Sequence, residues 1–152
     1  MNRVAAVVLA AGASTRMGSP KALLPARTGG GESFAEAIAA TARAAGVDDV
    51  VFVLGPPHGE AIAARLPAGA RSAWNPDPAR GMLSSVQAGI AALQHEVGAA
   101  LVWPVDQPWV AIETVRAVLA APADRIALPA HGPRGPCYIG TSRHIPKNPP
   151  CA

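Results

Sequence analysis

The sequence predicts an α/β fold in three layers, with helices on both faces of a mostly parallel sheet. Apolar runs alternate with segments of helical period along most of the 152 residues. The apolar runs lack the polar alternation of strands that have one face in water, which is typical of strands buried between helices. The length suits a single domain that buries a sizeable core. Hydrophobic residues make up 50% and aromatic residues only 4%, so the core must consist of Ala, Val, Leu and Ile.

The first strand is expected at Val4–Leu9 and runs into a turn of small residues. Two cations follow, Arg16 and Lys21, at a place where backbone N–H groups are free to meet phosphate. Small side chains in the turn would let a ligand approach the backbone. The turn consists of Ala10, Ala11, Gly12, Ala13 and Ser14. The segment therefore predicts a triphosphate-binding loop.

Residues 1–14 also allow a competing interpretation as a short signal peptide. One cation, Arg3, and about eight apolar residues make a poor signal sequence, however. Arg16 and Lys21 allow another alternative, as plain solvated charges that follow a buried strand.

Helices and strands then alternate along the chain. Ser33 and Glu36 have the spacing of a capping box, which predicts a helix that ends near Gly46. The further strands are expected at Val50–Leu54, Ala70–Trp74, Ala99–Val105 and Ile126–Pro129. A second helix is expected at His58–Leu66. A third should begin after a cap of Ser84 and Gln87 and bury Val86, Ile90 and Leu93. A fourth should begin at Pro108–Ala111, with Ile112, Val115 and Leu119 inward.

The charge distribution argues against a nucleic-acid binder, although the sequence pI is about 9.4. The nine cations of residues 1–124 are outnumbered by the ten acids, so the basicity belongs to the tail. No apolar run approaches the roughly 18 residues of a membrane span, and we expect a soluble, cytoplasmic protein without membrane contact. Two cysteines, Cys137 and Cys151, imply no disulfide framework.

The spacing of the phosphate-binding segment excludes two common motifs. Five residues separate Gly12 from Gly18, and Lys21 comes three later, so the segment is no P-loop. Positions 14 and 17 hold Ser and Met, so it is no dinucleotide fingerprint. From Leu9 to Lys21 it resembles the signature L-A-A-G-x-S-x-R-M-G-x-x-K of the MobA-like nucleotidyltransferases. Within that superfamily Ala11 looks like the cytidylyltransferase branch, because the guanylyltransferase branch usually has glycine there.

Asp106 is a lone carboxylate at the end of an apolar strand, in V-W-P-V-D-Q-P-W. A charge in that setting is costly unless a cation meets it, and Mg²⁺ usually takes one or two carboxylates plus substrate phosphates. In the family that this chain resembles, the matching Asp of the D-Q-P element binds the metal. The alternative is that Asp106 caps the next helix.

Residues 75–85 form a second element of the resemblance. N-P-D-P-A-R-G-M-L-S-S looks like the family's N-x-x-x-x-x-G-M-x-S-S segment, where the Asn and the serines lie near the nucleotide. The alternative is that Ser84 and Ser85 are helix caps and that Asn75 closes a turn. With the first motif, the resemblance implies nucleotide binding by Leu9, Ala10, Ala11, Gly12, Ala13, Ser14, Asn75, Gly81, Ser84 and Ser85. Gly55 is predicted to join them because it follows the second strand, and ligands collect at the carboxyl ends of parallel strands.

The resemblance implies a Rossmann-like fold of the nucleotide-diphospho-sugar transferase type and a Mg²⁺-dependent enzyme. The expected reaction moves CMP from CTP to molybdenum-molybdopterin and releases pyrophosphate. Lys21, Arg16 and Asp106 are its expected catalytic residues. A guanylyltransferase that uses GTP, and a sugar- or alditol-phosphate nucleotidyltransferase, are the alternatives. Contact with a molybdoenzyme or a maturation factor is also expected.

Past Gly132 the apolar pattern fails and prolines recur, which predicts a nucleotidyltransferase domain at residues 1–132 and an irregular or disordered tail at 133–152. The resemblance ends near Gly135. Family members continue with a G-H-P element and later acidic residues, so the sequence looks cut short, as a shifted reading frame would make it. A nucleotide-binding domain impaired in catalysis is therefore the rival class.

Overall fold

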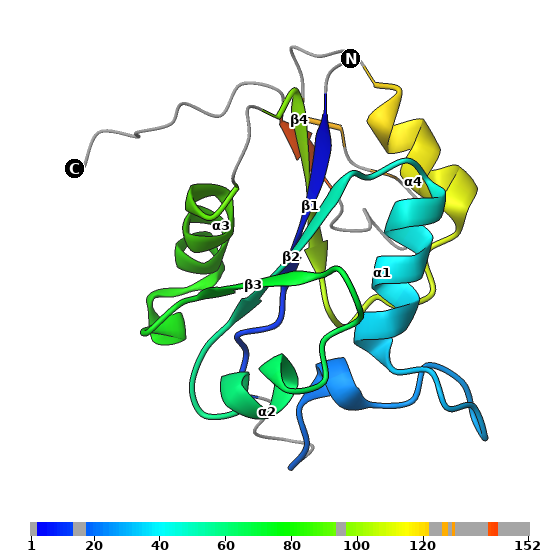
Figure 1. The fold of residues 1–152 in the computed structure, drawn as a ribbon. Coiled ribbons are helices and arrows are strands. Elements are labelled where there is room, and N and C mark those ends of the chain that lie inside the picture. The colour runs from blue at the N-terminus through cyan, green and yellow to red at the C-terminus, as the bar shows by residue number, and fades with distance from the viewer. Residues whose placement is uncertain are drawn as a thin grey trace.

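Among the described residues, five strands form one sheet in the order β3-β2-β1-β4-β5, and β1 to β4 are parallel (Figure 1). The computed structural model describes residues 3–13, 18–93, 97–121, 126–127, 129 and 140–142. The strands are β1 (Val4–Leu9), β2 (Asp49–Leu54), β3 (Arg71–Trp74), β4 (Ala99–Pro104) and β5 (Gly140–Ser142), which pairs with β4 in the antiparallel sense. The predicted α/β fold with a mostly parallel sheet is confirmed.

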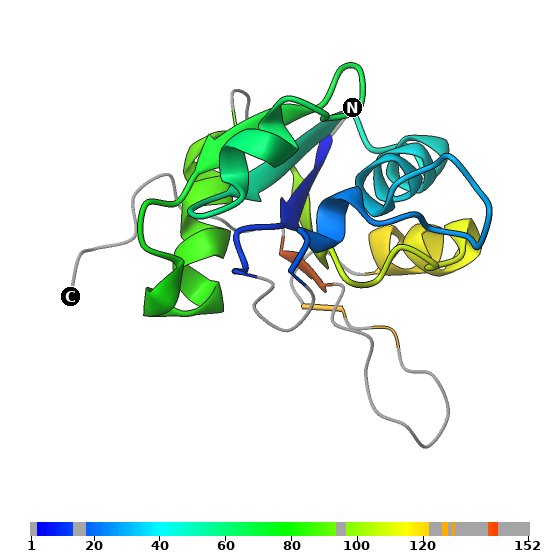
Figure 2. The ribbon, with the colours of Figure 1, turned by 90° about the horizontal axis from the view of Figure 1, so that it is seen from below.

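Helices cover both faces of the sheet, with α1 and α4 on one side and α3 on the other (Figure 2). The helices are α1 (Phe34–Ala44), α2 (Gly59–Ala63), α3 (Met82–Ala91) and α4 (Ile112–Leu119), with 3₁₀ turns η1 (Lys21–Leu23) and η2 (Pro78–Arg80). Val8 packs into the core under α1 and α4, whereas its neighbour Val7 packs into the core under α3. This alternation is the period of a strand that is buried on both faces.

The strand order places a topological switch point between β1 and β4. The chain proceeds from β1 outward to β2 and β3, then returns across the sheet to β4 on the other side of β1. In open parallel sheets, ligands bind beyond the carboxyl ends of the strands at such a point.

Helix α3 lies close to the sheet through small residues. A Cβ atom built on Gly89 would lie 2.2 Å from Cγ1 of Val7, which leaves no room for a side chain. Ser84, Ser85 and Gly89 are buried on this helix. The predicted stripe was wrong at Val86 and Ile90, which are only partly buried and lie outside the core under α3, whereas the predicted Leu93 packs against it. Short side chains on the sheet side allow the helix and sheet backbones to approach.

Helices α1 and α4 agree better with the prediction from the sequence. Ser33 and Glu36 form the predicted capping box, in which the Glu36 carboxylate accepts from the Ser33 N–H at 2.7 Å and from its hydroxyl at 2.8 Å. These hydrogen bonds lower the pKa of Glu36 below its usual value. Helix α4 begins at Ile112, later than the predicted Pro108–Ala111, and it buries Val115 and Val118.

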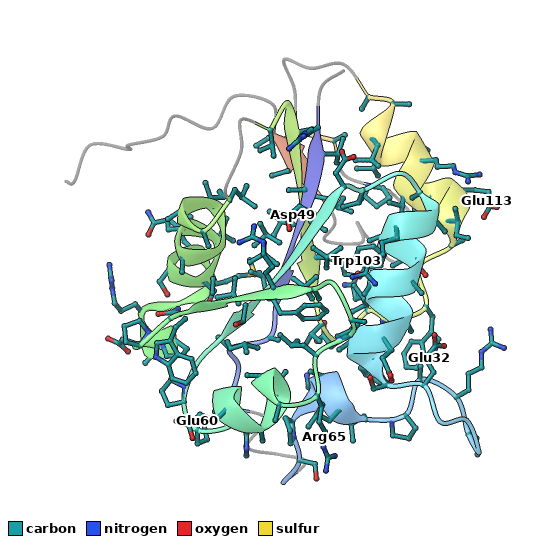
Figure 3. All side chains as sticks on the ribbon, viewed as in Figure 1. Glu32, Asp49, Glu60, Arg65, Trp103 and Glu113 are labelled. Carbon is teal, nitrogen blue, oxygen red and sulfur yellow. The ribbon has the colours of Figure 1, made fainter. Side chains whose placement is uncertain are left out.

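Polar and aromatic contacts fix the sheet to its neighbours. Figure 3 shows Trp103 of β4 between the sheet and α1, and this side chain is fully buried, so the core does not consist of Ala, Val, Leu and Ile alone. Its indole N–H donates to the carbonyl of Gln107 at 2.9 Å, which holds the turn after β4. Arg71 pairs with Asp49, also labelled in Figure 3, and donates to the carbonyl of Ala92 at 3.1 Å. Strands β2 and β3 and the end of α3 are thereby joined.

The carboxyl-terminal part differs from the sequence prediction. Of the predicted strand Ile126–Pro129, Ala127 forms a β-bridge and residue 128 lies outside the described residues, so this strand stays a prediction, whereas β5 was not predicted. Strand β5 falls inside residues 133–152, the segment predicted to be irregular. Cys137 and Cys151 lie outside the described residues, and the division of the chain at residue 132 stays a prediction. In the part that is described, every helix is too short or too polar to cross a bilayer.

Candidate nucleotide site at the switch point

A cavity of about 460 Å³ opens beyond the carboxyl ends of β1 and β4. One side, here called the β1–β4 wall, consists of residues 9–12, 20–22 and 104–106. The opposite side, here called the β3–α3 wall, comes from residues 75–85, of which Pro78, Gly81, Met82 and Ser85 line the cavity. The volume lies within the roughly 300–1,000 Å³ of small-ligand sites.

The backbone of the first turn forms the floor of the β1–β4 wall. The N–H of Ala10 continues the sheet by donating to the carbonyl of Val53 at 3.0 Å, and the Ala10 and Ala11 side chains are buried. At Gly12 the situation changes, because a built Cβ would meet no atom of the described protein within 4 Å. Space beside Gly12 is therefore open to a ligand. Ala13 is exposed and does not line the cavity.

Lys21 and Asp106 are the charged groups of this wall. The ammonium nitrogen of Lys21 lies 3.4 Å from a carboxylate oxygen of Asp106, although the two residues are 85 positions apart. Their side chains keep 38% and 51% of their surface exposed. Asp106 is not the cap of α4, because that helix begins six positions later at Ile112. The pair is therefore accessible from the cavity and is not held as a buried salt bridge.

The β3–α3 wall is built around the side chain of Asn75, which is only 4% exposed. Its amide nitrogen donates to the hydroxyl oxygens of Ser84 and Ser85, both at 2.9 Å, and its amide oxygen accepts from the N–H of Asp77 at 3.1 Å. Ser84 in turn donates to the carbonyl of Gly81 at 2.7 Å. These bonds tie the end of β3 to the first turn of α3.

Two glycines shape this wall for different reasons. A Cβ built on Gly55 would lie 2.6 Å from the carbonyl oxygen of Asn75 and 2.8 Å from Cγ of Pro78, so only glycine allows the end of β2 to approach this turn. Gly81 precedes α3 with φ of 98°, a conformation that favours glycine. Neither serine is the helix cap, since α3 begins at Met82 and Gly81 occupies the cap position without a side-chain bond.

The cavity brings together much of the site that the sequence predicts. The predicted residues that line it are Leu9, Ala10, Ala11, Gly12, Lys21, Gly81, Ser85 and Asp106. Gly55, Asn75 and Ser84 lie behind the lining, where they pack or position it. Ser14 and Arg16 lie outside the described residues. The lining also includes Met82, which sequence reasoning missed even though it belongs to the G-M-x-S-S segment.

Within the described part of the chain, no three His, Cys, Asp or Glu side chains gather into a metal cluster. Asp106 alone nevertheless fits a site for Mg²⁺, since this ion commonly binds one or two carboxylates and completes its shell with substrate phosphates and water. A metal at this position would depend on a bound triphosphate for its other ligands.

Residues 6–149 match the MobA-like NTP transferase domain family. Rv0371c from Mycobacterium tuberculosis H37Rv is a similar structure, with 28% identity and a TM-score of 0.78 over 93% of this chain and 71% of that one. A nucleotidyl transferase from Methanothermobacter thermautotroptrophicus (Mth528) has 27% identity and a TM-score of 0.77 over 94% and 72%.

A complex of Rv0371C with manganese also matches, with 30% identity and a TM-score of 0.61, and covers 77% of this chain and 58% of that one. No curated protein matches the sequence.

Proposed function

Because the chain belongs to the MobA-like NTP transferase domain family, we propose that it transfers CMP from CTP to molybdenum-molybdopterin and releases pyrophosphate. Membership in this family shows the general activity, which is that of a nucleotidyltransferase with a nucleoside triphosphate as substrate. The nucleotide, the acceptor and the metal belong to the proposal.

The pairing of Lys21 with Asp106 at the switch point carries the proposal. A triphosphate brings several negative charges, so its site needs a cation and a means of holding a second one. Lys21 supplies the first, and the carboxylate of Asp106 supplies an oxygen ligand for Mg²⁺. Both side chains are substantially exposed, so their ion pair can open when a nucleotide binds. Lys21 would then contact phosphate, and Asp106 would bind the metal.

Asp106 would hold the Mg²⁺, whose charge would help to neutralise the triphosphate. The manganese complex of Rv0371C supports a divalent ion in this family. The chain's own contribution is to bind and orient. The open floor at Gly12 would receive phosphate against the backbone, and Lys21 would stabilise charge on the reacting phosphate. Arg16 is expected to hold the leaving pyrophosphate.

The reaction needs no protein nucleophile. A phosphate oxygen of the acceptor attacks the α-phosphorus of the nucleotide, a new P–O bond forms, and the bond to the β-phosphate breaks as pyrophosphate leaves. Catalysis of this kind depends on alignment and charge neutralisation. The two walls of the cavity supply groups of both kinds, with Lys21 and Asp106 on one and a fixed hydrogen-bonded turn on the other.

Ala11 supports CTP over GTP. It lines the cavity, and its methyl group, which is buried against the core under α3, leaves less room in this turn than a glycine would. A pyrimidine base needs less room than a purine, so the smaller nucleotide is the proposed substrate.

The test combines calorimetry with a pyrophosphate-release assay. The purified chain is titrated with CTP and with GTP in the presence of Mg²⁺, and release is then measured with molybdenum-molybdopterin as acceptor. We expect tighter binding of CTP and release that requires the acceptor. Release with sugar or alditol phosphates instead would favour that alternative acceptor class, and binding without release from any acceptor would favour a nucleotide-binding domain without transferase activity.

A further inference from the structure

The orientation of the Asn75 side-chain amide is determined by its surroundings. Its oxygen faces the backbone N–H of Asp77 at 3.1 Å, and a flipped amide would place two donors against each other there. The amide nitrogen therefore faces the two serines, and it donates one hydrogen bond to each hydroxyl oxygen. The residue is 4% exposed, so water does not compete for these bonds.

The two hydroxyl groups then differ in what they can still do. Each oxygen accepts from Asn75, and each hydroxyl keeps one proton to donate. Ser84 donates its proton to the carbonyl of Gly81 at 2.7 Å, so its donor capacity is used inside the wall. Among the described residues, no acceptor receives a hydrogen bond from Ser85, which lines the cavity.

We propose that Asn75 is a positioning residue that makes Ser85 a hydrogen-bond donor to the bound nucleotide. Because the amide occupies a lone pair of the Ser85 oxygen, the hydroxyl proton must point elsewhere, and the open direction is the cavity. The matching ligand group is an oxygen that accepts and cannot donate, such as a phosphate oxygen or a base carbonyl. This inference rests on the proposed function, since it takes the ligand to be a nucleotide.

Three residues of the segment 75–85 therefore have different roles. Ser85 touches the ligand, Asn75 acts through Ser85, and Ser84 anchors the turn to Gly81. Asn75→Asp is the most informative change, because the carboxylate has nearly the same shape but only accepts. Both hydroxyl groups would then donate to residue 75, and Ser85 would turn its lone pairs toward the ligand.

The experiment is a double-mutant cycle read by calorimetry with Mg-CTP. We expect Ser85→Ala and Asn75→Asp each to weaken binding about tenfold or more, the loss of one hydrogen bond to a charged or carbonyl oxygen. In the Ser85→Ala background, Asn75→Asp should cost clearly less than it does in the wild type, because the donor is already gone. Thermal melting of each variant shows whether it is folded, and Ser33→Ala, at the N-cap of α1, is a control that lowers stability outside the cavity lining.

Additive losses across the cycle would overturn the inference, since an added charge or a general loosening acts regardless of Ser85. Unchanged binding in Ser85→Ala would overturn it as well. A wild type that binds neither CTP nor GTP would overturn the proposed function and this inference together, whereas binding by the wild type with an additive cycle removes the inference alone. Titration with Mg-tripolyphosphate locates the partner: a loss shared with CTP assigns a phosphate oxygen, and a loss confined to CTP assigns an oxygen of the nucleoside.

Discussion

The two walls of the cavity hold their polar groups in opposite ways. On the β1–β4 wall, Lys21 and Asp106 pair at 3.4 Å with much of their surface exposed. On the β3–α3 wall, Asn75, Ser84 and Ser85 are buried and linked by hydrogen bonds of 2.7–3.1 Å. An exposed ion pair contributes little to stability, whereas a buried polar network is costly to break. The first wall is therefore suited to exchange partners with a ligand, and the second to keep its shape.

The largest effect is expected at the exposed wall. Lys21→Ala should lower turnover by two orders of magnitude or more while the fold stays intact, because the charge on the reacting phosphate loses its cation. Pyrophosphate release at saturating nucleotide measures the effect, and a thermal melt checks the fold. Arg43→Ala is the matched control, since it removes a cation from the last turn of α1, outside the cavity lining. Full activity of Lys21→Ala would remove Lys21 from the proposed mechanism.

Substitutions of two glycines, Gly55 and Gly12, test the two walls separately. Gly55→Ala should lower the free energy of unfolding by about 1–3 kcal/mol, because the new methyl group would meet the carbonyl of Asn75 and the ring of Pro78. Urea denaturation measures this loss. A variant as stable as the wild type would show that the β3–α3 wall adjusts more easily than its close packing indicates.

Gly12→Ala should do the reverse. Its new methyl group meets no described protein atom, so stability should change little, while a ligand that approaches the backbone is displaced. We expect nucleotide affinity to fall about tenfold, the loss of roughly one good contact to phosphate. Calorimetry with Mg-CTP gives the affinity, and unchanged binding would mean that phosphate does not lie against this turn.

What the sequence predicted well are features that depend on neighbours along the chain. The apolar run of β1, the capping box of Ser33 and Glu36, and the placement of Asp106 after β4 all follow from local pattern. The cavity also gathers most of the residues that the motifs single out, because parallel strands end at the same edge of the sheet.

The sequence did not predict features that depend on contacts between residues far apart along the chain. The buried face of α3 is set by the approach of Gly89 to Val7 and Val53, which a search for large apolar residues overlooks. Strand β5 is three residues long and pairs in the antiparallel sense with β4, so its position is determined by that partner and not by its own composition. The different roles of Ser84 and Ser85 likewise require the position of Asn75, nine and ten residues away.

A smaller effect is expected at Ala11, on the β1–β4 wall. Ala11→Gly should shift the preference from CTP toward GTP by up to about tenfold, since a single methyl group in a pocket discriminates by about that much. The ratio of the two dissociation constants measures the shift. If the ratio stays the same, the choice of base is made elsewhere in the site.

The smallest effect is expected at Glu36, which belongs to neither wall. Hydrogen bonds from Ser33 lower its pKa in the folded state, so the ionised carboxylate is the form that stabilises α1. That contribution is present above the unfolded-state pKa of 4.5 and is lost as the pH falls through the lower folded-state pKa. Glu36→Gln should therefore cost about 0.5 kcal/mol at pH 7, typical of an anion at a helix N-terminus, and nothing at a pH low enough to protonate the carboxyl in the folded protein. Urea denaturation at the two pH values tests the sign, and because Ser33 and Glu36 lie outside the cavity lining, nucleotide affinity at pH 7 should not change. A change in affinity would mean that α1 and the cavity are coupled, and that the division into an exchanging wall and a fixed wall is too simple.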